Sequence, residues 1–175
     1  MESQVEQAKR GDQEAIARIV REHYASVYRF CARRIGPDLA EDAAQDTFLS
    51  AQKAIKRFDG RSSLSTWLLG IAHNHCRALS RKRKSEIPIE DLWLGEAMTT
   101  SGDEKRVIDQ EALRAALAKL SPEHREVVLL HEIDGLSYDE AAQVLGIPSG
   151  TVKSRLHHAF LNLRRALGAP DGVIA

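Results

Sequence analysis

The sequence predicts an all-α protein with two small helical domains joined by a flexible acidic linker. Apolar residues recur at three- and four-residue spacing in both halves of the chain, and no stretch shows sustained strand alternation. Between the halves, an acidic segment with one proline and two glycines lacks clear periodicity. A length of 175 residues leaves room for two small domains. We therefore expect domains at residues 1–84 and 107–175 and a linker at 85–106.

The N-terminal domain is expected to contain three helices. The first ends at Gly36–Pro37, and its inward stripe is Ile16, Ile19, Val20, Tyr24, Val27, Tyr28, Cys31 and Ile35. The second has the stripe Ala40, Ala43, Ala44, Thr47, Phe48, Ala51 and Ile55. A loop rich in Gly and Ser follows at 58–63. The third helix is expected to place Leu64, Trp67, Leu68, Ile71, Ala72 and Leu79 inward, and to present on its other face Thr66, Gly70, His73, Asn74, Arg77 and Arg81.

Helical periodicity resumes after the linker, with leucines at positions 113, 117 and 120. Ser121–Pro122 is a typical helix start, and Gly135 is expected to end the helix that begins there. The C-terminal helix is expected to end near Gly168 and Pro170.

The segment 136–160 reads as two short helices joined by a tight turn, which is the layout of a helix-turn-helix. Ser137 followed by Glu140 forms a capping box for the first helix. Gly146 can adopt the left-handed conformation of a sharp exit, and Pro148 favours the start of the second helix. Because the second helix of this motif lies in the DNA major groove, the segment predicts DNA binding.

The second helix of this motif has one apolar and one open face. Its inward residues are expected to be Val152, Leu156, Ala159 and Leu163. The open face then presents Thr151, Lys153, Ser154, Arg155, His157 and His158. An ordinary helix pair with a solvated charged face is the alternative. DNA binding is favoured because the small, glycine and apolar positions all fall in register.

Charge is distributed unevenly along a chain whose formal net charge is zero. Residues 61–84 contain six basic residues and no acid, whereas residues 85–111 contain eight acids and two bases. A weak overall field argues against tight autonomous DNA binding, since phosphate neutralisation supplies much of that affinity. A larger partner could supply the missing electrostatic attraction.

Several classes of protein are disfavoured by composition. No apolar run approaches the ~20 residues that span a bilayer, and the N-terminus lacks the apolar core of a secretory signal. Two cysteines, Cys31 and Cys76, make no disulfide framework, so a cytoplasmic location is expected. His73, His75 and Cys76 resemble a ligand cluster, but residues 73 and 75 of a helix point to different faces. We therefore expect no metal, no other cofactor, no membrane insertion and no enzymatic activity.

The order of the segments resembles the extracytoplasmic-function sigma factors of bacterial RNA polymerase. The likeness rests on DAAQDTF and RFDGRSSLSTWL in the helical domain, the acidic linker, and GTVKSRLHHA at the C-terminal end. It covers roughly residues 10–168. GTVK-type helices also occur in response regulators, so the combination of motifs in this order carries the resemblance.

The resemblance implies roles for residues of the N-terminal domain. The helix that docks on the polymerase clamp is matched by Asp42, Gln45, Asp46 and Phe48. A solvated acidic face is the alternative for the polar members of this set. The loop that captures a flipped base of the minus-ten element is matched by Asp59, Gly60, Arg61, Ser62 and Ser63, and the path of the strand by Asn74, Arg77 and Arg81. Trp67 could pack in the core or stack on DNA.

The C-terminal domain is implied to read the minus-thirty-five element. Its contacts would come from Thr151, Lys153, Ser154, Arg155, His157 and His158, with Arg155 placed on phosphate. The chain departs from common members of the family at Gln52, where many carry Trp, at Leu69–Gly70, where many carry Tyr-Arg, and at His73, where many carry Arg. These departures make the minus-ten reader less basic at its start. The acidic linker could enter the polymerase cleft or act as a solubilising spacer.

The expected function is therefore that of a sigma factor, which binds core RNA polymerase, directs it to promoter DNA and helps to melt the promoter. An anti-sigma factor is expected as a further partner, because members of this family are commonly held inactive by one. The alternative is a stand-alone helix-turn-helix regulator that binds an operator. The motif DAAQDTF and the lack of a βα phosphoacceptor domain argue against that alternative.

Overall fold

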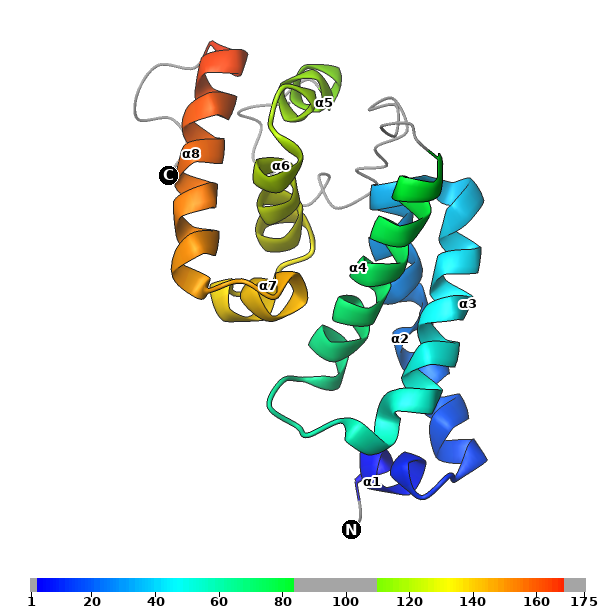
Figure 1. Cartoon of the computed structure of the whole chain (residues 1–175). Coiled ribbons are helices and arrows are strands. Elements are labelled where there is room, and N and C mark those ends of the chain that lie inside the picture. The colour runs from blue at the N-terminus through cyan, green and yellow to red at the C-terminus, as the bar shows by residue number, and fades with distance from the viewer. Residues whose placement is uncertain (1–2, 84–109, 169–175) are drawn as a thin grey trace, which may run out of the picture. The chain divides into compact units, whose positions relative to one another are not determined.

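The computed structural model describes residues 3–83 and 110–168, which form helices and turns without any strand (Figure 1). This confirms the all-α class. The chain divides into two compact units, Met1–Ile87 and Pro88–Ala175, and each is described by itself. The expected linker, 85–106, lies outside the described residues, and the expected domain bounds stay predictions.

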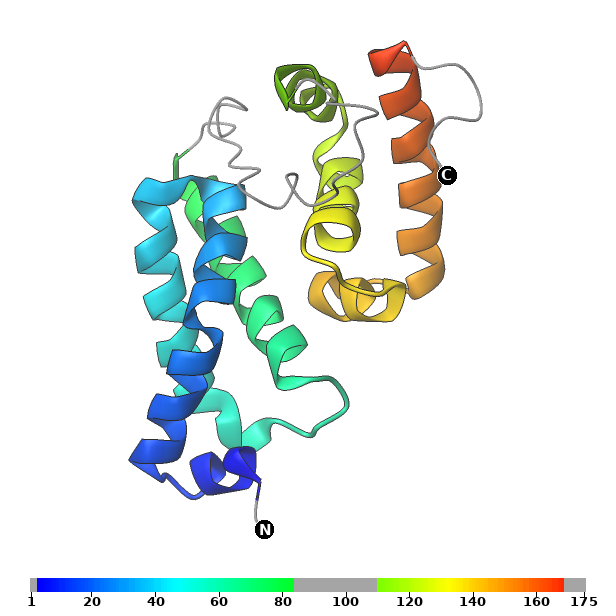
Figure 2. The ribbon, with the colours of Figure 1, turned by 180° about the vertical axis from the view of Figure 1, so that it is seen from behind.

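The first unit consists of the helices α1 (Gln4–Lys9), α2 (Gln13–Ile35), α3 (Pro37–Ala54) and α4 (Leu64–Arg83), with a 3₁₀ turn, η1 (Ile55–Arg57), after α3. Helices α2, α3 and α4 pack side by side, and α1 packs against α2 and η1 (Figures 1 and 2). The loop before α4 and the short α1 lie at the same end of this bundle. Helix α1, whose N-cap is the Ser3 side chain, was not predicted from the sequence.

The core of the first unit follows the predicted stripes of α2 and α3 closely. All seven predicted residues of α3 and η1 are buried. In α2, Ile19, Val27, Cys31 and Ile35 are buried and the other four predicted residues are half-buried. Phe30 is also in the core, although it lies outside the predicted stripe, and the Arg34 guanidinium lies 3.5 Å from the centre of its ring.

The predicted inward face of α4 is right in part. Leu68 and Ala72 are buried as predicted, and Leu64, Trp67, Ile71 and Leu79 are half-buried. The prediction was wrong for Thr66 and His73, which were assigned to the outer face and are buried, and it did not include the buried Leu69. Thr66 is buried because the Ser63 hydroxyl accepts from the Thr66 amide at 3.0 Å and contacts the Thr66 hydroxyl at 2.9 Å. Since α4 packs against both α2 and α3, its buried face takes in polar side chains that its periodicity assigned to solvent.

The second unit consists of α5 (Gln110–Ala118), α6 (Pro122–Val128), the π-helical turn η4 (Leu129–Ile133), α7 (Tyr138–Leu145) and α8 (Ser149–Leu167). Helices α5, α6 and α7 all pack against α8. Val152, Leu156, Ala159 and Leu163 of α8 are all buried, as predicted. Gly168 ends α8 with a φ of 63°.

Helix α6 begins at the predicted point, because the Ser121 hydroxyl accepts a hydrogen bond from the His124 amide at 3.3 Å. It then widens into η4, which the sequence analysis treated as ordinary helix. The four consecutive residues 127–130 are all buried, so this stretch of helix is buried on more than one face. The segment ends at Gly135 with a φ of 72°, as expected.

Arg125 ties α6 to the end of α5. Its guanidinium donates to the carbonyl oxygens of Leu117, Ala118 and Leu120 at 3.0, 3.1 and 3.1 Å. These carbonyls lie where α5 ends, and that of Leu117 also accepts from the Leu120 amide at 3.2 Å. A cation there adds hydrogen bonds to the helix terminus and opposes the negative end of the helix dipole.

Candidate nucleic-acid interface

The turn between α7 and α8 has the local geometry that the sequence predicts. The Ser137 hydroxyl accepts from the Glu140 amide at 3.2 Å, and the Glu140 carboxylate accepts from the Ser137 amide at 2.9 Å. Gly146 has a φ of 66°, and the Ile147 amide donates to the Ala142 carbonyl at 3.1 Å. Pro148 directly precedes α8. A helix-turn-helix is therefore present, with α8 as its second helix.

The outward face of α8 is open along the predicted row. Lys153, Ser154, His157 and His158 are exposed, and Thr151 and Arg155 are half-buried. All six thus lie on one accessible side of a single helix, as an interface with a DNA groove requires.

Side chains from α6, η4 and α7 contact both flanks of this face. On one flank the Lys153 ammonium lies 5.4 Å from the centre of the Tyr138 ring, which stacks on His131 at 4.7 Å. On the other flank Arg155 pairs with Glu123 at 3.3 Å. The rings of His124 and His158 stack at 6.3 Å, and His157 meets His158 edge-on at 5.6 Å.

The sequence analysis did not identify these supporting residues, namely Glu123, His124, His131 and Tyr138. No local sequence signal marks the contacts of Glu123 and His124, because they bring together positions that are far apart in the chain. Tyr138 could have been noticed in the sequence, because it is a large aromatic residue directly after the capping Ser137. In the structure it is 39% exposed.

The second unit carries little net attraction for polyanions. Residues 110–168 contain seven basic and seven acidic residues, together with four histidines. Attraction to phosphate must therefore arise from the local arrangement of charge on α8 and not from the charge of the whole unit.

In the first unit, the loop before α4 is organised around Asp59. Its carboxylate accepts from the Arg61 amide at 3.1 Å and pairs with the Arg61 guanidinium, also at 3.1 Å. Gly60 sits between them with a φ of 73°, and both charged side chains are mainly exposed. Ser62 is half-buried, and Ser63 is exposed while its hydroxyl caps α4. The loop therefore presents a compact turn whose cation is already paired.

A polar row continues along α4 from this loop. Asn74, Arg77 and Arg81 are all exposed and follow one another at three- and four-residue spacing, so they share one side of the helix. Trp67 is half-buried, and its ring centre lies 5.1 Å from that of Phe58. Of the two interpretations of Trp67, this contact favours packing.

An exposed patch lies on α3. Asp42, Gln45 and Asp46 are exposed, and the Gln45 amide donates to the Glu41 carboxylate at 3.4 Å. Phe48 does not lie on this surface, because it is 8% exposed and stacks on Tyr24 at 6.0 Å. The apolar side chain that does is Leu49, which is 56% exposed. Its spacing of three residues from Asp46 places it on the same side of α3.

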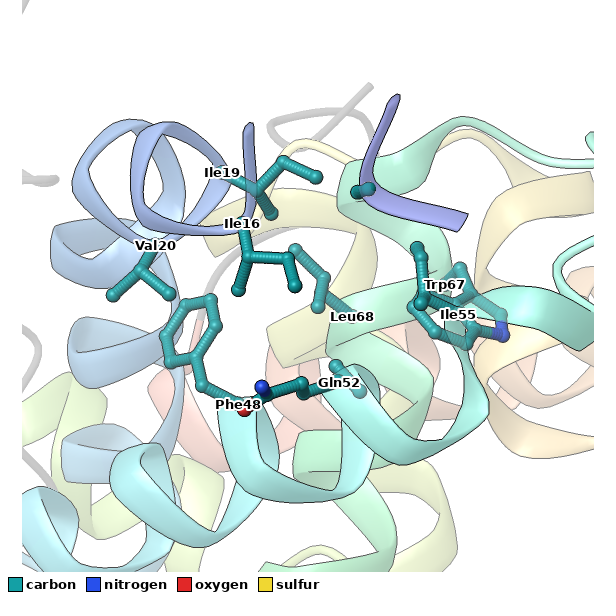
Figure 3. A pocket seen from close by; sticks show the side chains of 10 residues that line it. Ile16, Ile19, Val20, Phe48, Gln52, Ile55, Trp67 and Leu68 are labelled. Atoms are coloured by element: carbon teal, nitrogen blue, oxygen red, sulfur yellow. The ribbon is translucent and has the colours of Figure 1, made fainter. Parts of the chain in front are cut away.

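Beside this patch is an apolar groove (Figure 3) with an empty volume of about 300 Å³, including space open to solvent. Side chains of α2, α3 and α4 line most of it, among them Ile16, Phe48, Trp67 and Leu68. Gln52 is its one polar lining residue. Many members of the family that this sequence resembles carry Trp at this position.

The histidine and cysteine cluster of α4 is dispersed over different surroundings. His75 shares a 2.9 Å hydrogen bond with the Ser50 hydroxyl, and His73 is buried. Cys76 is buried beside Cys31, and its hydrogen bond lowers the pKa of the Cys31 thiol, which burial would raise. Within residues 3–83 and 110–168 no group of three or more His, Cys, Asp or Glu residues could hold a metal ion. None of the helices in these two ranges is long and apolar enough to cross a membrane.

Two protein-family models match the chain. Residues 19–86 match the model described as sigma-70 region 2, and residues 110–163 match sigma-70 region 4. The chain is 34% identical to the ECF RNA polymerase sigma factor SigW of Bacillus subtilis, over 95% of this chain and 96% of that protein. It is 35% identical to the ECF RNA polymerase sigma factor SigC of Mycobacterium tuberculosis, over 87% and 83% of the two chains.

Solved structures of similar proteins agree with these matches. CnrH, in complex with the cytosolic domain of CnrY, has a TM-score of 0.68 and 28% identity, over 95% of this chain and 96% of that chain. The sigma factor RpoE, in complex with the anti-sigma factor NepR from Bartonella quintana, has a TM-score of 0.64 and 27% identity, over 87% and 96%.

Proposed function

This chain belongs to the extracytoplasmic-function sigma factors of bacterial RNA polymerase, and from that premise we propose how its surfaces perform the family's function. The protein binds core RNA polymerase and directs it to promoter DNA. The observation that carries this conclusion is the presence of sigma-70 regions 2 and 4, in order, in one chain with an open helix-turn-helix. The match to region 2 disfavours a stand-alone operator-binding regulator.

The α3 patch is the proposed docking surface for the polymerase. Asp42, Gln45 and Asp46 supply two carboxylates and an amide on the same side of α3 as the exposed Leu49. An apolar side chain rimmed by polar groups is the usual composition of a protein interface. Phe48 supports the patch from the core by fixing α3 against Tyr24.

The loop before α4 and the row along α4 are the proposed minus-ten reader. The loop residues Asp59, Gly60, Arg61, Ser62 and Ser63 would hold an unpaired base, since a tight turn exposes backbone groups for close approach. Asn74, Arg77 and Arg81 would follow the phosphates of the same strand. Capture of an unpaired base offsets the free energy of unstacking it, and thereby helps to open the promoter.

The outward face of α8 is the proposed minus-thirty-five reader. Lys153, Ser154, His157 and His158 are placed to contact base edges, and the half-buried Thr151 and Arg155 are placed to contact phosphate. In this scheme the core polymerase performs nucleotide addition, and the chain needs no catalytic group of its own.

An anti-sigma factor is the further partner that we propose. One of the similar structures is a sigma factor in complex with an anti-sigma factor. Such a partner would have to compete with core polymerase for this chain. We expect an anti-sigma factor from the source organism to reduce transcription in the assay below and to be displaced by excess core polymerase.

Transcription in vitro with core polymerase and the full chain tests the proposed function. A library of DNA templates should yield initiation at specific positions that share two sequence elements, and only when the chain is present. Arg77→Ala with Arg81→Ala should weaken initiation, because both cations are lost from the strand path. Lys56→Ala with Arg57→Ala, which removes two exposed cations from η1, is the matched control. Absence of specific initiation on every template would refute the proposal.

A further inference from the structure

The first turn of α6 contacts the recognition helix α8 on the flank that faces it. The Glu123 carboxylate lies 3.3 Å from the Arg155 guanidinium. The neighbouring ring of His124 stacks on His158, with 6.3 Å between ring centres and 27° between planes. Positions 155 and 158 are one turn apart on α8. Two adjacent residues of α6 therefore contact two side chains on neighbouring turns of the recognition helix.

Stability of the fold does not explain this arrangement. The Glu123 side chain is 70% exposed and that of Arg155 is 27% exposed, and ion pairs near the surface contribute little to folding. A carboxylate beside a surface that meets phosphates also repels DNA. Glu123 therefore weakens the overall attraction to DNA, and any favourable effect on binding must come from the way in which it orients Arg155.

The geometry indicates how this orientation acts on binding. A guanidinium has five N–H donors in a planar fork, so pairing with one carboxylate oxygen fixes its plane and leaves donors for phosphate. A stacked imidazole likewise loses rotational freedom while its edge stays available. Side chains that are oriented before binding lose less conformational entropy when they bind, which favours the DNA that fits them.

We propose that Glu123 and His124 are positioning residues of the minus-thirty-five reader, which orient Arg155 and His158 and reduce attraction to DNA of the wrong sequence. This inference rests on the proposed function and deepens it. Glu123 acts through Arg155, and its charge is one of the seven acidic charges that balance the seven basic residues of 110–168 and so limit non-specific binding.

Glu123→Gln is the primary test, made in the full chain bound to core polymerase. The released Arg155 should bind phosphate regardless of sequence, so affinity for a scrambled upstream duplex rises. Discrimination between the selected and scrambled duplexes should fall about fivefold. The slope of log affinity against log salt should steepen by up to about one, because the charge of Arg155 is no longer neutralised by a carboxylate and displaces more counterions from the phosphates. With Arg155→Ala present, Glu123→Gln should change neither discrimination nor slope.

Asp139→Asn is the matched control, because it removes an equal charge from an exposed position in the same unit. It should raise affinity for both duplexes by the same factor. For the second contact, His124→Ala should relax the base preference at the position that His158→Ala also relaxes. His124→Phe keeps a ring that can stack and should preserve the preference. All variants should retain the wild-type melting temperature.

The outcomes separate the inference from the proposed function. Selection from a randomised upstream library with the wild-type complex comes first, and failure to enrich any sequence contradicts the proposed function. If the wild type enriches a sequence but Glu123→Gln behaves like Asp139→Asn, the inference is overturned. It is also overturned if Glu123→Gln still lowers discrimination between the two duplexes in the Arg155→Ala background.

Discussion

Three arginines of this protein serve different purposes, and burial and partner distinguish them. Arg125 donates to three backbone carbonyls at the end of α5, where it completes a helix terminus. Arg34 is buried over the ring of Phe30. Arg155 is held by a carboxylate beside the open face of α8. Residue type alone therefore predicts none of these roles, and the partner defines each.

Gln52 provides a test of packing at the residue scale. Replacing it with Leu should place apolar surface in the groove lined by Ile16, Phe48 and Leu68, and raise the free energy of unfolding by about 0.5–1 kcal/mol. Urea denaturation of the full chain measures this change. Both Gln52 and Lys53 are exposed, but Lys53 does not line the groove, so Lys53→Leu should give no gain. A loss of stability in Gln52→Leu would show that the groove cannot accept the larger apolar side chain.

The Cys31 thiol provides a test of pH dependence. The hydrogen bond from Cys76 and, to a smaller extent, the charge of Arg34 lower its pKa in the folded protein, against the effect of burial. The unfolded chain then binds the proton more tightly. The free energy of unfolding should therefore increase as pH rises towards the ordinary thiol pKa, and this gain should be lost as pH falls through the folded pKa.

Denaturation at a series of pH values, with thiolate absorbance as a second measurement, checks this expectation. Cys76→Ala removes the donor, so it should raise the pKa of Cys31 and flatten the pH dependence. Cys31→Ala should abolish the thiolate signal that titrates first. An unchanged profile in Cys76→Ala would contradict the assigned cause.

At the scale of elements, capping decides where helices begin and how they are rotated. The Ser137–Glu140 pair supplies reciprocal hydrogen bonds at the start of α7. Ser137→Ala should therefore lower the free energy of unfolding by about 1 kcal/mol and weaken minus-thirty-five binding through loss of α7 order. Thermal denaturation and duplex affinity measure the two effects. Ser154→Ala, in the exposed middle of α8, should leave stability intact, and equal melting temperatures for both variants would contradict the capping role.

Stripes of purely apolar residues were predicted well. The stripe of α8 was right at Val152, Leu156, Ala159 and Leu163. The inward face of α4 was right at Leu68 and Ala72, but it missed Thr66 and His73, because periodicity assigns polar residues to solvent and the capping hydrogen bond of Thr66 lies within its own turn. The π-helical turn η4 also escaped prediction, since its apolar run is compatible with an ordinary helix.

The candidate surfaces show the same limit. Periodicity placed Lys153, Ser154, His157 and His158 on an open face, and the structure agrees. It could not find Glu123 or His124, because their contacts depend on how α6 packs against α8. Periodicity did place Phe48 on the inward stripe, and Phe48 is buried. The resemblance assigned Phe48 to the docking surface, where the exposed apolar side chain is that of Leu49.

At the scale of the whole molecule, polymerase binding and DNA reading are assigned to separate surfaces and should be separable by mutation. Leu49→Ala combined with Asp46→Ala should reduce affinity for core polymerase about tenfold or more, because an apolar and a charged contact are lost together from one side of α3. Co-purification and competition with unmodified protein measure the change. Asp38→Ala, which removes an exposed charge from the first turn of the same helix, is the control. Equal binding by all three proteins would remove the α3 patch from the polymerase interface.

The balanced charge of residues 110–168 has a consequence for the fate of newly made protein. A genome presents about 10⁶–10⁹ non-specific sites, and a strongly cationic factor would be sequestered on them before meeting a polymerase. A module without net charge spends little time on such DNA, so the free concentration of the protein follows its synthesis or release closely. Transcription can then respond as soon as the factor becomes available, without first saturating the chromosome.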